Sequence, residues 1–88
     1  MSIINFGGTI TASTSGSLGD FDGFTLVYVH SKATDKQVTI CTSKTDNTAV
    51  RTFQIGLDQS LVVEKTSTQG IFGESADIFF TPVNSVRG

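Results

Sequence analysis

Residues 24–57, FTLVYVHSKATDKQVTICTSKTDNTAVRTFQIGL, carry the strongest structural signal in this sequence. They contain three short apolar runs, FTLVYVHS, QVTICTS and AVRTFQIGL, separated by the polar segments KATDK and KTDNT. Runs rich in β-branched and aromatic residues and bounded by turn-forming residues are typical of β-strands. The spacing predicts an antiparallel meander with strands over residues 24–31, 37–43 and 49–57.

The first of these strands is apolar on both faces. Successive side chains of a strand point to opposite sides, so Val27 and Val29 share one face and Leu26, Tyr28 and His30 share the other. This pattern is typical of a central strand, or of a strand whose second face is covered by something else.

The second and third strands show cleaner alternation. In the second strand, the face with Val38, Ile40 and Thr42 is predicted to point to the core. The opposite face, with Gln37, Thr39 and Cys41, is predicted to be solvated or lightly covered. The third strand presents three residues that are predicted to lie in the core: Phe53, Ile55 and Leu57.

The rest of the chain adds short strands over residues 1–6, 9–12, 60–65 and 76–83, with a glycine-containing loop over residues 66–75. Pro82 cannot donate a backbone hydrogen bond, so the last strand is predicted to end there or to lie at a sheet edge, followed by a polar tail. No helical periodicity is present. The sequence predicts an all-β fold, a small antiparallel β-sandwich or partly open barrel of six to seven short strands.

The length of 88 residues indicates a single β domain over residues 1–88. Residues 1–23 carry glycines and the flexible stretch STSGSLG, and two interpretations of them stay open. They form either an edge strand folded onto the domain or an extended N-terminal arm that reaches a neighbouring subunit.

Charge and hydropathy exclude several classes of partner. The net charge is −2 and the six Lys and Arg residues are scattered, which predicts no nucleic-acid partner. No apolar run approaches the roughly 20 residues of a membrane span, which predicts no membrane partner. The N-terminal MSIINFGG lacks a basic region followed by an apolar stretch, so we expect synthesis in the cytoplasm without a signal peptide.

A domain of this size is marginally stable and usually needs a disulfide, a metal or oligomerisation. The chain has one cysteine and one histidine, so neither an internal disulfide nor a metal or other cofactor is expected. Only 16% of residues are charged, whereas 13 are Thr and 10 are Ser. Such a surface tolerates burial against a neighbour, and exposed sheet edges favour pairing, so we expect a homo-oligomer or a symmetric array.

The residues that could support catalysis are isolated, and the sequence predicts that the protein is not an enzyme. His30 is interpreted as a rim or turn residue, and Cys41 as a small buried or half-buried apolar residue. The segment from Asp20 to Gly23 loosely resembles the start of a calcium loop, but the spacing is wrong. We interpret it as a turn in which aspartate caps backbone amides.

The segments LVVEK at residues 61–65 and ADIFFTPV at residues 76–83, preceded by AVRTFQIGL, resemble the C-terminal part of small virion structural proteins of tailed bacteriophages. The resemblance covers about half the chain and carries no catalytic motif. It implies a β-sandwich subunit located in the virion, with phage capsid or tail proteins as partners. It carries over no site residue, because such proteins act through contact surfaces.

These observations lead to two functional expectations. The first is a capsid decoration (cement) protein that binds the shell through apolar and Ser/Thr-rich surfaces. The second is a tail- or fibre-associated receptor- or carbohydrate-binding module, although the chain has no Trp and one Tyr to stack on sugars. The predicted contact residues are apolar, lie near glycines and stand outside the core strands: Ile3, Ile4, Phe6, Ile71 and Phe72. The last two are either tucked under the sandwich or presented to a partner.

Overall fold

The computed structural model describes residues 3–6 and 10–87, including the side chains of residues 10–83. These residues form eight strands and no helix, so no helix long and apolar enough to cross a membrane is found among them. The strands are β1 (Ile3–Phe6), β2 (Thr11–Ala12), β3 (Leu26–Ser31), β4 (Lys36–Ser43), β5 (Asp46–Ile55), β6 (Ser60–Glu64), β7 (Gly70–Gly73) and β8 (Ile78–Arg87).

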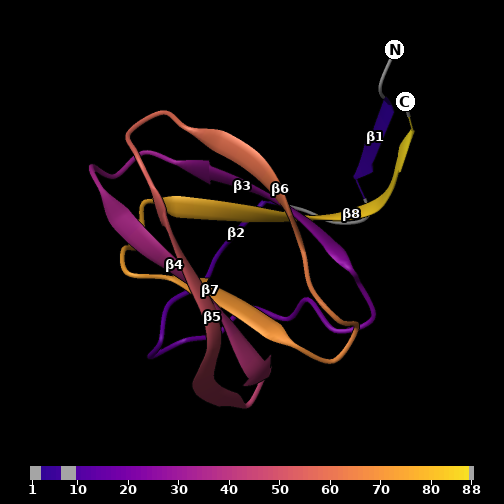
Figure 1. Ribbon diagram of the computed structural model, residues 1–88, viewed down its shortest axis with the longest axis horizontal. Coiled ribbons are helices and arrows are strands. Elements are labelled where there is room, and N and C mark those ends of the chain that lie inside the picture. The colour runs from indigo at the N-terminus through magenta and orange to yellow at the C-terminus, as the bar shows by residue number, and fades with distance from the viewer. Residues whose placement is uncertain (1–2, 7–9, 88) are drawn as a thin grey trace.

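The strands form two antiparallel sheets (Figure 1). The larger sheet has the order β1-β8-β3-β6, with the short β2 also paired to β8, and the smaller sheet has the order β5-β4-β7. The predicted all-β, sandwich-like fold is therefore confirmed. The smaller sheet crosses the larger one, and the core lies between them (Figure 1).

The predicted meander is wrong in its pairing. β3 pairs with β6 and β8, whereas β4 pairs with β5 and β7, so only β4 and β5 form the expected hairpin. Residues 32–35 carry the chain from one sheet to the other, with Ala33 buried and Asp35 at a φ of 43°. Alternation shows that each strand has a core face, but both sheets share one core, so the pattern leaves strand partners undetermined.

The core is made of aliphatic and aromatic side chains from both sheets. β3 lies between two neighbours, which confirms the central strand that its two apolar faces predicted. Each sheet contributes branched side chains that interdigitate with those of the other, the arrangement that stabilises a β-sandwich. The buried cluster comprises Phe21, Val27, Val29, Ala33, Val38, Ile40, Ile55, Val63, Ile71, Ile78 and Phe80.

Leu57 is not a core residue, contrary to the prediction. The chain leaves β5 at Gly56, whose carbonyl accepts a hydrogen bond from the Gln59 N–H, and Asp58 takes a φ of 59°. These two features make a turn, and Leu57 lies on it with 56% of its surface exposed. The alternating pattern therefore ends two residues earlier than the sequence suggests.

The predicted loop over residues 66–75 contains strand β7, which pairs with β4. Gly70 allows this pairing, because a Cβ there would lie 2.7 Å from Cys41 Sγ and 2.9 Å from the Ser43 carbonyl oxygen. Ile71 is 0% exposed and lies in the core. The glycines in this segment thus mark close packing of a strand rather than a flexible connection.

β8 continues through Pro82 to Arg87, so the predictions of a strand end at Pro82 and of a polar tail are wrong. On one side of β8, Pro82 is opposite Val27 of β3. On the other side, the residues of β8 before Pro82 pair with β2 and those after it pair with β1. The missing N–H of proline is therefore accommodated where the neighbouring strand changes.

The described strands within residues 1–23 pair with a later strand of the same chain. β1 and β2 both pair with β8, and Figure 1 shows β1 beside the end of β8, away from the two-sheet body. Ser13 is buried, and its hydroxyl donates to the Ile71 carbonyl at 2.7 Å and accepts from the Gly19 N–H at 2.9 Å. Phe21 then enters the core against Phe80. Residues 10–23 therefore pack on the domain, and β1 pairs with β8 of the same chain. That the N-terminal segment reaches a neighbouring subunit stays a prediction.

Candidate functional site

The outer face of the larger sheet brings together side chains that point away from the core. In β3, Val27 and Val29 are buried, so Tyr28 and His30 point to the opposite face. Residues directly opposite each other in an antiparallel pair lie on the same side of the sheet. The cross-strand neighbours of Tyr28 and His30 therefore belong to this face: Val62 and Ser60 from β6, and Thr81 and Phe79 from β8.

An open groove of about 410 Å³ lies on this face. We call it the outer-face groove, and its lining residues are Ile10, Tyr28, His30, Phe79 and Thr81. None of the five carries a carboxylate, an ammonium or a guanidinium group. Ile10 is 70% exposed, so it adds a large aliphatic side chain to the surface of the groove.

The groove contains one imidazole, that of His30. His30 Nδ1 is hydrogen-bonded to the Ser60 hydroxyl. The nearby Asp58 carboxylate instead accepts from the Lys32 ammonium at 2.9 Å, which lowers the pKa of Asp58. A nucleophile–base pair gains its activity from a third group that orients the base. Among the described contacts no carboxylate orients His30.

Cys41 is fully buried, which confirms its interpretation as a small apolar residue. Its thiol donates to the Ser43 carbonyl at 3.4 Å, and β7 packs beside it through Gly70. Burial raises the pKa of the Cys41 thiol, which leaves it in the unreactive protonated form at neutral pH.

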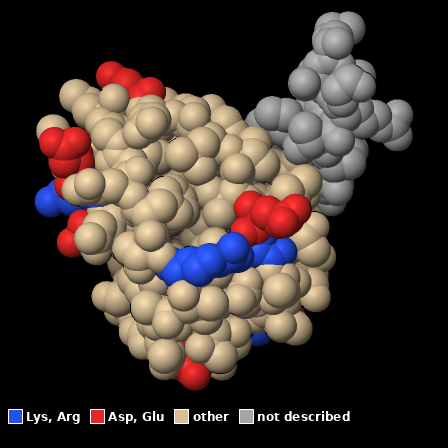
Figure 2. Space-filling model, in the orientation of Figure 1, with Lys and Arg blue, Asp and Glu red and all other residues tan. Residues whose placement is uncertain are grey.

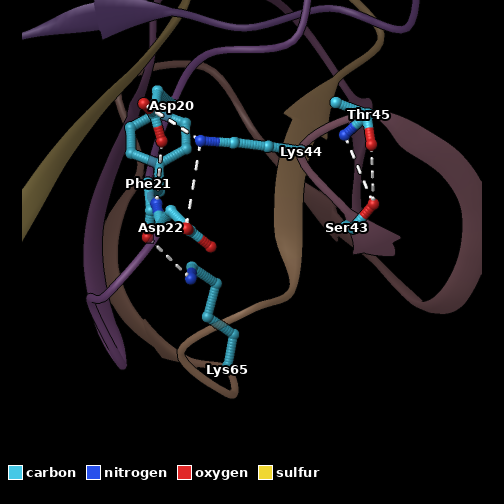
Figure 3. Close-up of polar contacts among 7 residues, drawn as sticks. All are labelled: Asp20, Phe21, Asp22, Ser43, Lys44, Thr45 and Lys65. Carbon is cyan, nitrogen blue, oxygen red and sulfur yellow. Dashed lines mark hydrogen bonds and ion pairs between the residues drawn. The ribbon is translucent and has the colours of Figure 1, made fainter.

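The segment from Asp20 to Gly23 forms the predicted aspartate-capped turn (Figure 3). The Asp22 N–H donates to Asp20 Oδ1 at 3.1 Å, and Gly23 takes a φ of 86° that favours glycine. Lys44 Nζ lies 3.6 Å from Asp20 Oδ2 and 3.9 Å from Asp22 Oδ2. Within residues 3–6 and 10–87, no three His, Cys, Asp or Glu side chains come together in a group that could hold a metal.

The residues predicted as partner contacts do not gather into one surface. Ile3, Ile4 and Phe6 lie in β1, and their side chains fall outside those the structure describes. Ile71 is fully buried and follows the tucked alternative, so the expectation that its side chain meets a partner is wrong for the folded chain. Phe72 is half-buried in β7, opposite Thr39 in the smaller sheet.

The sequence did carry a signal for the outer-face groove. Leu26, Tyr28 and His30 form a second apolar face on a strand that already has one, the pattern of a strand covered on both sides. The groove also needs Ile10 and Phe79, which are far apart in sequence and become neighbours because β2 pairs with β8.

Comparison of the chain with protein-family models, with curated proteins and with solved structures gave no match in any of the three. The outer-face groove is therefore the feature of the structure from which we infer function.

Proposed function

We propose that this protein is a structural, non-enzymatic subunit that docks on a larger protein assembly through the outer-face groove. The form of assembly that the sequence resemblance favours is the virion of a tailed phage, with the chain as a capsid decoration protein. The observation that carries the proposal is the outer-face groove itself, whose lining combines apolar, aromatic, hydroxyl and imidazole side chains with no carboxylate, ammonium or guanidinium group.

The composition of this face matches the centre of a protein–protein interface. Interface centres are depleted in charged residues and enriched in aromatic ones, which anchor the contact by filling pockets on the partner. Tyr28 and Phe79 are aromatic and half-buried, and Ile10 and Val62 add exposed aliphatic surface. The wider surface is also sparing in charge, since acidic and basic side chains occupy few places on the face seen in Figure 2.

A specific interface would cover a modest part of the surface of the chain. A standard interface buries about 800 Å² on each partner. The accessible surface of the chain is 4918 Å², so docking of this kind would cover about a sixth of it. The outer face of the larger sheet supplies part of this area, where β8, β3 and β6 lie side by side (Figure 1).

Polar substitution in the groove tests this proposal. Ile10→Thr and Phe79→Thr keep residue types that suit a β-strand, but they remove apolar contact surface from the groove. Val50→Thr is the matched control, because Val50 is 50% exposed on β5 of the other sheet. The assay is co-sedimentation of each variant with particles of the phage whose genome carries the gene. The proposal expects weaker binding by the first two variants and unchanged binding by the control; equal binding by all three would contradict it.

A carbohydrate- or receptor-binding module is the second candidate. Aromatic rings beside polar groups suit a sugar, and the groove places Tyr28 and Phe79 near His30 and Thr81. A glycan array probed with the wild-type chain and with Phe79→Thr separates the two functions. Glycan binding that is lost in Phe79→Thr, together with no association with particles, would favour the second candidate.

A further inference from the structure

Lys65 follows β6 and is almost completely buried, with 3% of its surface exposed. Its ammonium donates to three backbone carbonyl oxygens, those of Phe24 at 2.6 Å, Phe21 at 2.9 Å and Thr66 at 3.1 Å. Figure 3 shows the side chain reaching the turn that carries Asp20 and Asp22. A lysine is rarely buried to this degree unless it is paired, and these three carbonyl oxygens are the partners of Lys65.

The three carbonyl oxygens match the three N–H donors of an ammonium group in number, and their partial negative charge suits its positive charge. An ammonium has three N–H donors and no acceptor, and each donor has one carbonyl here. No carboxylate forms an ion pair with Lys65 among the described residues; Asp22 and Asp20 act on it from farther away. The charge is thus held by oriented carbonyl dipoles, the arrangement that proteins also use for monovalent metal cations.

These contacts link the connection between β2 and β3 to the end of β6. The Gly23 N–H donates to the Ser67 carbonyl at 2.7 Å, and the Lys65 N–H donates to the Thr25 carbonyl at 2.9 Å. Inside the same connection, Phe21 packs its ring on Phe80 at a centroid distance of 5.8 Å. The ammonium therefore fixes the segment that delivers a large aromatic side chain to the core.

We propose that the carbonyls of Phe21, Phe24 and Thr66 form a binding site for a monovalent cation, which the protein fills with its own Lys65 ammonium. In this role Lys65 is an internal cation that clasps the turn at Asp20–Phe24 to the end of β6. Removal of the ammonium leaves an empty cation site and takes one donor from each of the three carbonyls. The Phe21 and Thr66 carbonyls keep a backbone donor, the N–H of Phe24 and of Gln69, each at 3.2 Å. The site then accepts a small ammonium ion from solution. This inference is independent of the outer-face groove.

Chemical rescue tests the cation site. Lys65→Ala removes three methylenes and the ammonium, so propylammonium has the size of the missing group. Urea unfolding is measured in sodium chloride and in propylammonium chloride at equal ionic strength, for the wild type, Lys65→Ala and Lys32→Ala. Lys32 is the control, because its ammonium pairs with Asp58 on the surface.

The expected result is that propylammonium raises the unfolding midpoint of Lys65→Ala in a saturable manner, with no such rise in the wild type or in the control. The same response in all three proteins would overturn the proposal. If Lys65→Ala is unfolded in sodium chloride, refolding upon addition of propylammonium supports the site, and a chain that stays unfolded overturns it.

A second variant tests, by hydrogen exchange, whether the Lys65 ammonium holds the turn in place. Lys65→Met keeps the apolar stem and loses the three donors, and Lys32→Met is its control. Hydrogen exchange at the Gly23 amide, which is bonded to the Ser67 carbonyl, is expected to become about tenfold faster in Lys65→Met. Exchange at the wild-type rate would show that the ammonium does not hold the turn.

Discussion

The close approach of β7 to β4 makes a sharp prediction for Gly70→Ala. The added Cβ would lie 2.7 Å from Cys41 Sγ and 2.9 Å from the Ser43 carbonyl oxygen, with the Ser43 carbonyl carbon at 3.2 Å. Two of these atoms are backbone atoms of the neighbouring strand, and the sulfur is buried, so none of the three can move without disturbing the smaller sheet. The substitution must therefore separate β7 from β4 or strain both.

The size of the effect follows from two opposing terms. Overpacking by one methyl group in a close-packed region costs about 1–3 kcal/mol. Replacing glycine by alanine recovers about 0.4–1 kcal/mol, because the unfolded chain loses conformational freedom. We expect Gly70→Ala to lower the free energy of unfolding by about 1–2 kcal/mol. In a domain of this size each 1 kcal/mol corresponds to about 4–8 °C in Tm.

Urea denaturation followed by circular dichroism measures this change. Gly16→Ala is the matched control, since Gly16 is exposed and a Cβ there would meet nothing within 4 Å. The control is expected to match the wild type within about 0.5 kcal/mol. Equal stability of Gly70→Ala and Gly16→Ala would refute the packing of β7 on β4 described above.

Three further predictions concern buried polar groups. Cys41 should react with a thiol reagent only as fast as the chain unfolds, because it is buried; rapid labelling of the folded protein would contradict this. Ser13→Ala should lower the free energy of unfolding by about 1–3 kcal/mol in urea titrations, because the Ile71 carbonyl and the Gly19 N–H both lose their partner; an unchanged midpoint would argue against these bonds. Burial lowers the pKa of Lys65, and Asp22, Cys41 and Asp20 only partly oppose this. The folded state then loses this proton before the unfolded state does, so the stability of the wild type relative to Lys65→Met should increase as pH rises from the lowered pKa towards 10.5. A difference that shrinks over this range would contradict the effect of burial.

Strand positions could be read from the sequence because alternation and turn residues are local signals. Val38 and Ile40 are buried, as the alternation in the second predicted strand indicates, but Thr39 and Cys41 on its opposite face are buried as well. Strand partners could not be read in this way, since a core face does not specify which strand lies beside it. Leu57 shows a second limit, because the turn at Asp58 interrupts an alternation that the sequence continues.

The candidate site was predictable only in part. The second apolar face of β3, with Tyr28 and His30, is visible in the sequence, and it is the floor of the outer-face groove. Ile10 and Phe79 carry no local signal, because their proximity depends on the pairing of β2 with β8. Ile71 misled the prediction for a related reason: Gly70 and Gly73 flank the Ile71–Phe72 pair, as in a loop, but here they permit close strand packing.

The proposed role as a docked subunit has one most direct test. Under the proposal that the chain is a virion subunit of a tailed phage, particles of that phage are purified on a density gradient, and the copies of this chain per particle are counted by quantitative mass spectrometry. The proposal predicts that the chain sediments with intact particles at a fixed copy number set by the symmetry of the shell or tail. A chain that stays at the top of the gradient, with none in the particle fraction, would contradict it.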